Sequence, residues 1–203
     1  MRHRLLALAT AAAVSVAVLP AHAATPKPQI TDPTGDANGF NDQGAGAPIP
    51  EQATPADDSG ADITSVTFAS TFVTKKVKRK TVKVPTGFTV TMALAAAPTP
   101  ETFYRVVASV PGCDQLFIEY GTDAAAGGTA MRCPALPGAT ATDYTIADAA
   151  VKGSSIIWSI PVSVMRAGTT LSSLSAQTRF NPAVVTAPQI DYASSSATFT
   201  VGK

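Results

Sequence analysis

The chain has 203 residues, of which 45% are hydrophobic and 14% charged, with a formal net charge of +1. This length is enough for one compact domain and short for two. The near-neutral charge excludes a generally basic nucleic-acid-binding protein, so no nucleic-acid partner is expected.

Residues 1–23 have the features of a secretory signal peptide. A basic start precedes the apolar run Leu5 to Leu19, and Ala21-His22-Ala23 is an A-x-A cleavage pattern. We expect cleavage after Ala23, a secreted extracellular protein and no integral membrane segment, because no later stretch approaches the roughly 20 apolar residues of a spanning helix. Cleavage removes both histidines of the chain, which excludes a Ser/His/Asp triad or a histidine-ligated zinc site.

Residues 24–60 are rich in Pro, Gly and Asp, and we expect this amino-terminal segment to be partly loop. The remaining residues, 61–203, are expected to form a single domain. Seven of the 14 acidic residues lie from Asp32 to Asp62, with no Lys or Arg between them. Like charges at this density require either solvent or a cation.

The turn Asp32-Pro33-Thr34-Gly35-Asp36-Ala37-Asn38-Gly39 is a candidate metal site. Oxygen-bearing side chains on Gly-rich turns suit Ca²⁺, although the EF-hand template fails because two of its carboxylates are absent. We predict a discontinuous Ca²⁺ site made by Asp32, Asp36, Asn38 and Asp62. The open alternative is a solvated acidic loop whose side chains cap their own backbone.

After Asp62 apolar residues alternate with Thr and Ser, the pattern of half-buried β-strands. Roughly seven or more short strands are implied, and helical signal is confined to one or two turns within 145–151 and 164–167. The predicted fold class is all-β, an antiparallel β-sandwich of jelly-roll or immunoglobulin-like type. A closed barrel is the alternative. The alternation is clearest in residues 88–94, 104–110, 116–120 and 156–160.

A basic cluster interrupts this pattern between two strand-like runs. It is predicted to be a hairpin with a charged tip that protects a sheet edge. No aromatic residue interleaves the cations, so stacking on nucleic-acid bases has no platform. Binding of an anionic cell-wall polymer and neutralisation of the acidic amino-terminal segment stay open as alternatives. The candidate polyanion-binding residues are Lys75, Lys76, Lys78, Arg79, Lys80 and Lys83.

Cys113 and Cys133 are the only cysteines. An even count in an oxidising compartment, on two runs able to pair as a hairpin, predicts a disulfide. Among the aromatic residues, Trp158 and Tyr104 share their strand faces with aliphatic residues and are expected in the core. Tyr144 and Tyr192 are expected to be exposed.

Carboxylate pairs are the one hydrolytic route that needs no histidine. The acids outside the amino-terminal segment are scattered, and Glu119 is expected to form a surface ion pair with Arg105 across two strands. We therefore expect no enzyme activity, with a small carboxylate-pair hydrolase acting on polysaccharide as the alternative.

Three segments together resemble a known group of domains: the D-P-x-G-D-x-N-G turn with Asp62 to Val66, the run Ile157 to Pro161 leading to Thr178, and the closing Asp191 to Gly202. Their order is similar to that in secreted bacterial β-sandwich domains related to DOMON and family-nine carbohydrate-binding modules. The resemblance implies a jelly-roll-like sandwich, a calcium site that Asp32, Asp36 and Asp62 match, and a sugar- or surface-binding role. The sole tryptophan departs from the paired exposed tryptophans that bind sugar in such modules.

These observations lead to one expectation of function. The chain is expected to be a secreted, non-catalytic β-sandwich module, stabilised by its disulfide and by Ca²⁺, with a binding or structural role at or near the bacterial cell envelope. A cell-wall polymer or polysaccharide is the expected partner.

Overall fold

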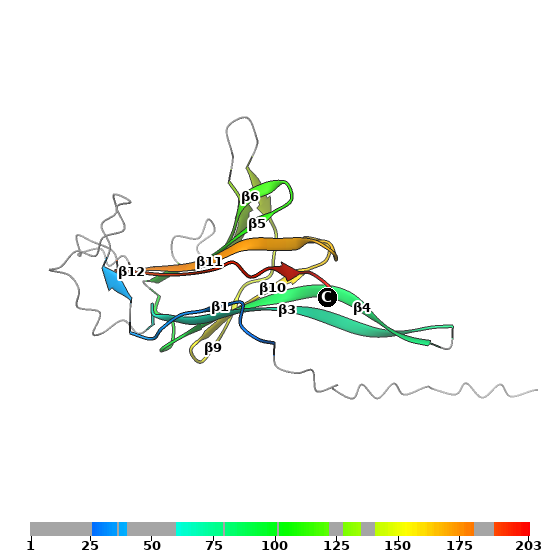
Figure 1. The fold of residues 1–203 in the computed structure, drawn as a ribbon, viewed down its shortest axis with the longest axis horizontal. Helices are drawn as coiled ribbons and strands as arrows, with labels where there is room; N and C mark the ends of the chain where they lie inside the picture. Colours follow the sequence, from blue (N-terminus) through cyan, green and yellow to red (C-terminus); the bar gives the residue numbers. More distant parts are fainter. Residues whose placement is uncertain are drawn as a thin grey trace, which may run out of the picture.

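The computed structural model describes residues 26–35, 37–39, 60–78, 80–100, 102–121, 128–134, 141–180 and 189–203. Every regular element within these ranges is a β-strand, and the strands form two antiparallel sheets (Figure 1). The predicted all-β class with a sandwich of antiparallel sheets is confirmed. The predicted export signal, residues 1–23, lies outside the described residues.

Neither of the two segments with weak helical signal forms a helix, in keeping with the predicted all-β class. Residues 145–149 have no regular structure and lead into a strand at Ala150. After Pro161 the amides of Val164 and Met165 both bond to the Pro161 carbonyl, which makes an isolated turn rather than a helix. Each segment is only a short connection beside a strand, too short to extend past a helix nucleus.

The smaller sheet has five strands in the order β1-β3-β4-β10-β9. Two of them, β3 and β4, are much longer than the others. The strands are β1 (Ile30–Thr31), β3 (Ile63–Val77), β4 (Lys80–Leu94), β10 (Ser155–Pro161) and β9 (Ala150–Lys152).

The larger sheet has the order β2-β12-β11-β5-β6-β7-β8, with β13 pairing with β11 outside this path. Its strands are β2 (Asn38–Gly39), β12 (Gln189–Ser195), β11 (Thr170–Phe180), β5 (Thr102–Val110), β6 (Cys113–Gly121), β7 (Gly128–Cys133), β8 (Thr142–Tyr144) and β13 (Phe199–Thr200). The amino-terminal segment thus supplies a short edge strand to each sheet, because both β1 and β2 come from it.

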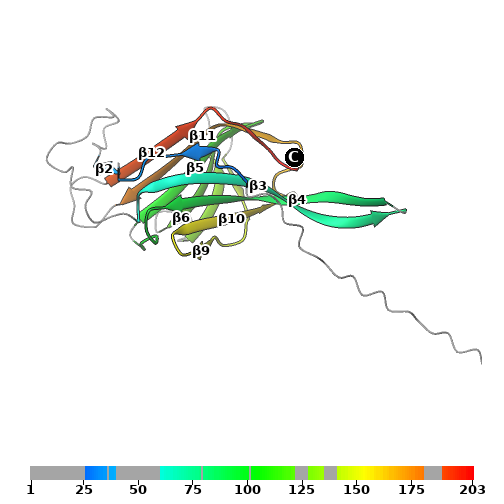
Figure 2. The same ribbon diagram turned by 60° about the horizontal axis from the view of Figure 1, so that its bottom comes forward.

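The core lies between the two sheets, which Figure 2 shows stacked over one another. Trp158 on β10 and Tyr104 on β5 are completely buried, as their alternation predicted. The indole Nε1 of Trp158 donates to the backbone oxygen of Glu119, 3.1 Å away on the opposite sheet. This bond satisfies the one polar atom of the largest core side chain and links the sheets at a defined register.

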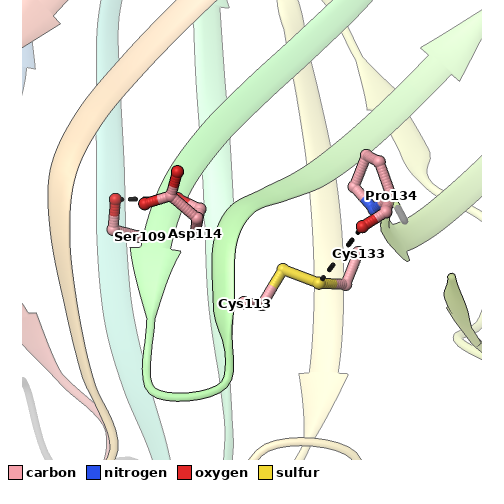
Figure 3. The surroundings of a disulfide bond; sticks show 5 residues. All are labelled: Ser109, Cys113, Asp114, Cys133 and Pro134. Atoms are coloured by element: carbon pink, nitrogen blue, oxygen red, sulfur yellow. Dashed lines mark hydrogen bonds between the residues drawn. A yellow bond between two sulfur atoms is a disulfide. The ribbon is translucent and has the colours of Figure 1, made fainter. Parts of the chain in front are cut away.

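The predicted disulfide is present. Cys113 opens β6 and Cys133 closes β7, the neighbouring strand, with a Cα–Cα distance of 5.8 Å (Figure 3). Both half-cystines are buried against the core. The bond closes the connection between two adjacent strands, so it restricts the unfolded chain around this edge of the larger sheet.

Replacing both cysteines with alanine is expected to lower the free energy of unfolding by about 3 kcal/mol, the loop-closure value for a ring of this size. Urea unfolding followed by tryptophan fluorescence measures this, since Trp158 is the only tryptophan. An unchanged denaturation midpoint would show that breaking the disulfide does not raise the conformational entropy of the unfolded chain enough to affect stability.

Candidate functional site

Beyond the sandwich, β3 and β4 continue as a two-stranded ribbon. Among the described residues, β1 pairs with β3 only at Ser65 and Val66, and β10 pairs with β4 only as far as Gly87. The ladder between β3 and β4 runs on from Phe72↔Pro85 to Val77↔Lys80. We call residues 72–85 the basic arm; it projects away from both sheets (Figures 1 and 2). The predicted hairpin is therefore confirmed, whereas protection of a sheet edge by its charges stays a prediction.

Two local features explain why the sandwich ends, and the basic arm begins, at this point of β3 and β4. A β-bulge between Thr71 and Phe72 interrupts the ladder where the third strand ends. On the other side, β10 packs so closely on Gly87 that a Cβ there would lie 2.2 Å from the Ile160 oxygen. Strand β10 then ends at Pro161, which has no amide hydrogen to donate. One further bond follows, from the Val162 amide to the Thr86 oxygen at 2.9 Å. Beyond Thr86, toward the tip, β3 is the only strand that pairs with β4 among the described residues.

The basic arm carries cations and no acids. No Asp or Glu occurs between Asp62 and Glu101, and no lysine of the arm forms an ion pair with any residue that the structure describes. The five described lysines are exposed, and Arg79 lies outside the described residues. These like charges produce an uncompensated positive field on a projecting element. The five lysines are Lys75, Lys76, Lys78, Lys80 and Lys83.

The opposite end of β3 contains the acids of the predicted metal site. Asp62 accepts the amide of Gly35 at 2.6 Å, which fastens the amino-terminal turn onto the start of β3. Asp32 directly follows β1 and lies beside β3, since its amide donates to the Thr64 oxygen. The structure therefore brings Asp32 and Asp62 to one end of the smaller sheet.

Sequence reasoning missed Asp191 at this end. It is buried, and its Oδ2 accepts the amide of Ile63 at 2.5 Å. The sequence did hold a signal for its burial: Asp191 is two residues from Ala193 on β12, so the two side chains lie on the same, inward face. Thr178, paired with Asp191, donates to the Ala61 oxygen at 2.5 Å. Both side chains thus hold the segment that enters β3.

The described part of the predicted metal site is incomplete. Asp36 lies outside the described residues, and Asn38 is described only as part of the backbone of β2. Among the described residues no group of three or more His, Cys, Asp or Glu side chains gathers as metal ligands. Asp32 and Asp62 offer carboxylate oxygens, the donor chemistry that Ca²⁺ takes.

Glu119 corrects the expectation of a surface ion pair. It does pair with Arg105 on β5, at 2.7 Å, but its side chain is completely buried. Arg132 on β7 lies on its other side, with Nε 2.9 Å from Oε2. The ring of Phe117 packs under both guanidinium groups, 4.3 and 5.9 Å from its centroid. The two guanidinium groups and the Phe117 ring thus shield this carboxylate from the solvent that was expected around it.

Replacing Glu119 with glutamine is expected to lower the free energy of unfolding by about 2 kcal/mol. The change leaves two guanidiniums facing each other without a counter-charge, although partial exposure of both lets water screen them. Asp148→Asn is the matched control, because that acid is exposed. Chemical denaturation of both variants measures the difference; equal stabilities would contradict a structural role for Glu119.

The two tyrosines predicted to be exposed differ. Tyr192 is 56% exposed, as expected. Tyr144 is half-buried and packs against the core, because β8 pairs with β7 and places this ring opposite the buried Met131. The prediction for Tyr144 was wrong because a three-residue edge strand gave no alternation to read.

An open cavity of about 580 Å³ lies beside the base of the basic arm. Its walls come from β3, β4, β10 and the connection after β8, and they carry no ionisable side chain. The cavity therefore offers hydroxyl and apolar contacts but no acid or base. The hydroxyl groups belong to Thr71, Thr86, Thr89, Thr145 and Ser159.

Comparison of the chain with protein-family models, with curated proteins and with solved structures found no match. Among the residues that the structure describes, no helix is long and apolar enough to cross a bilayer.

Proposed function

We propose that this protein is a secreted, non-catalytic binding module that acts at or near the bacterial cell envelope and holds an anionic partner with its basic arm. The observation that carries the proposal is the projection, beyond the sandwich, of a ribbon whose charged residues are all cationic. The resemblance to DOMON and family-nine modules supports a binding role. An anionic cell-wall polymer or polysaccharide is the first partner to test.

The shape of the basic arm suits an extended anion. Lysine ammonium groups on both sides of a narrow ribbon can reach charges along a polymer without a preformed pocket. Lys75, Lys76, Lys80 and Lys83 have their backbone fixed in a strand, so less chain entropy is lost on binding than in a disordered basic tail. A long-range positive field also speeds encounter with an anionic surface.

The alternative of a carboxylate-pair hydrolase has weaker support. The ion-paired Glu119 carboxylate contacts two arginines, and the described contacts of Asp62 and Asp191 fasten backbone segments. A glycosidase needs two carboxyl groups facing each other across the scissile bond. No such pair follows from the described contacts of these acids.

The triple variant K75Q/K76Q/K80Q is expected to bind heparin about tenfold more weakly or worse, and wild-type affinity is expected to fall steeply as salt rises. The matched control is K27Q/K152Q/K203Q, which removes the same charge from exposed positions outside the arm. Surface plasmon resonance on immobilised heparin and on polyphosphate measures both. Equal losses in the two triple variants would show that net charge, and not the basic arm, decides binding.

We further propose that Ca²⁺ stabilises the end of the sandwich opposite the basic arm. Asp32 and Asp62 would supply oxygen ligands, and the ion would neutralise part of the acidic amino-terminal segment. The bond from Gly35 to Asp62 supports this, because it already draws the Gly-rich turn onto the start of β3.

Saturating Ca²⁺ is expected to raise the melting temperature relative to excess EDTA. At 100 times the dissociation constant the gain is about 2.7 kcal/mol, since only the native state gathers the ligands. Asp32→Asn is expected to reduce the shift, whereas Asp148→Asn is not. A melting temperature that is the same in Ca²⁺ and EDTA would identify the turn as a solvated loop fastened by its hydrogen bonds to Asp62 and Thr64.

A further inference from the structure

The valines of the basic arm are concentrated on one side. Residues paired directly across antiparallel strands point to the same side of a ribbon. The side that we call the valine face consists of Val73, Val84, Lys75, Val82, Val77 and Lys80. The opposite side carries one apolar pair, Phe72 with Pro85, and is otherwise Thr and Lys: Thr74, Lys83, Lys76 and Thr81.

Three of the four valines are exposed among the described residues, and Val84, nearest the sandwich, is half-buried. Val77 is 52% exposed, Val73 41% and Val82 36%. Six large apolar side chains are exposed in the described part of the chain, and three of them lie together on the valine face. A fourth, Phe72, is 39% exposed at the base of the opposite side of the arm. A hydrated polyanion would neutralise the lysines but would leave these methyl groups in water. The valine face therefore calls for a partner that is both anionic and apolar.

A second copy of the arm does not meet this requirement. Pairing two basic arms would place lysines opposite lysines with no acid between them, and like charges directly opposite are destabilising. A lipid bilayer with anionic headgroups meets both requirements at once. Its phosphates pair with the lysine ammonium groups, and the boundary of its acyl chains contacts the valine methyl groups. The aliphatic part of each lysine side chain spans the distance between these two regions of the membrane.

We propose that the basic arm docks on anionic phospholipid membranes, with the valine face lying at the boundary between headgroups and acyl chains. This inference rests on the proposed function, because it names the anionic partner. Lys75 and Lys80 flank the valines on the same face, so charge and apolar contacts act together. The arm then lies on the membrane surface and does not span it.

The test compares V77T/V82T with the wild type. Threonine keeps the β-branched shape and strand preference of valine but puts a hydroxyl in place of a methyl group. The matched control is V151T, at a valine that is 44% exposed on β9, away from the arm. Binding is measured by co-sedimentation with vesicles of phosphatidylcholine alone and of phosphatidylcholine with phosphatidylglycerol. Heparin binding is measured on the same preparations.

The proposal expects binding only to the vesicles that contain phosphatidylglycerol. It expects V77T/V82T to bind these about tenfold more weakly while V151T and heparin binding stay at the wild-type level. Equal vesicle binding by V77T/V82T and wild type would overturn it and leave a purely electrostatic arm. Heparin binding without vesicle binding would also overturn it while sparing the proposed function. A concentration-dependent dimer abolished by V77T/V82T would assign the valine face to a second copy instead.

Discussion

The pairing of β3 with β4 is the interaction on which the rest of the structure depends. Its first part lies in the sandwich, where Val66, Phe68 and Val90 turn inward to the core. Its second part leaves the sandwich as the basic arm. An isolated two-stranded hairpin is marginally stable in water, so the arm relies on the sandwich to fix its register. One continuous ladder thus links core packing to the proposed binding element.

The acidic and basic residues lie at opposite ends of the β3–β4 ladder. Asp62 stands just before the first residue of β3, and Lys75 and Lys76 stand near its last. A strand of 15 residues is roughly 50 Å long at about 3.3 Å per residue. Acids and cations are therefore too far apart along the strand to neutralise each other through water at physiological salt. The arm stays available to an external anion.

The fold class was predictable because period-two alternation depends only on local sequence, and Trp158 and Tyr104 followed it into the core. The basic hairpin was predictable because two strand-like runs flank a short cationic stretch, and the disulfide because the chain has only two cysteines. Glu119 was not, because its burial depends on Arg132, a residue from a third strand whose position no local pattern shows. The length of the arm was also hidden, since strand signal does not say where a neighbouring strand ends.

The acidic end shows the same limit. Asp32 and Asp62 were grouped by residue type, and the structure does bring them to one end of the smaller sheet. Asp191 joins that end through the pairing of β12 with β11, more than 120 residues from Ile63, which it contacts. Such long-range contacts decide whether a carboxylate fastens backbone or faces a cation. Sequence spacing carries no information on them.

Amide hydrogen exchange, followed peptide by peptide in the free protein and with heparin bound, tests whether the basic arm is the anion-binding element. We expect fast exchange over residues 72–85 in the free protein, because a ribbon without a third strand opens easily. Heparin should slow exchange there and leave the sandwich strands β5, β6 and β11 unchanged. Protection confined to the sandwich, with the basic arm exchanging as before, would show that the anion binds elsewhere.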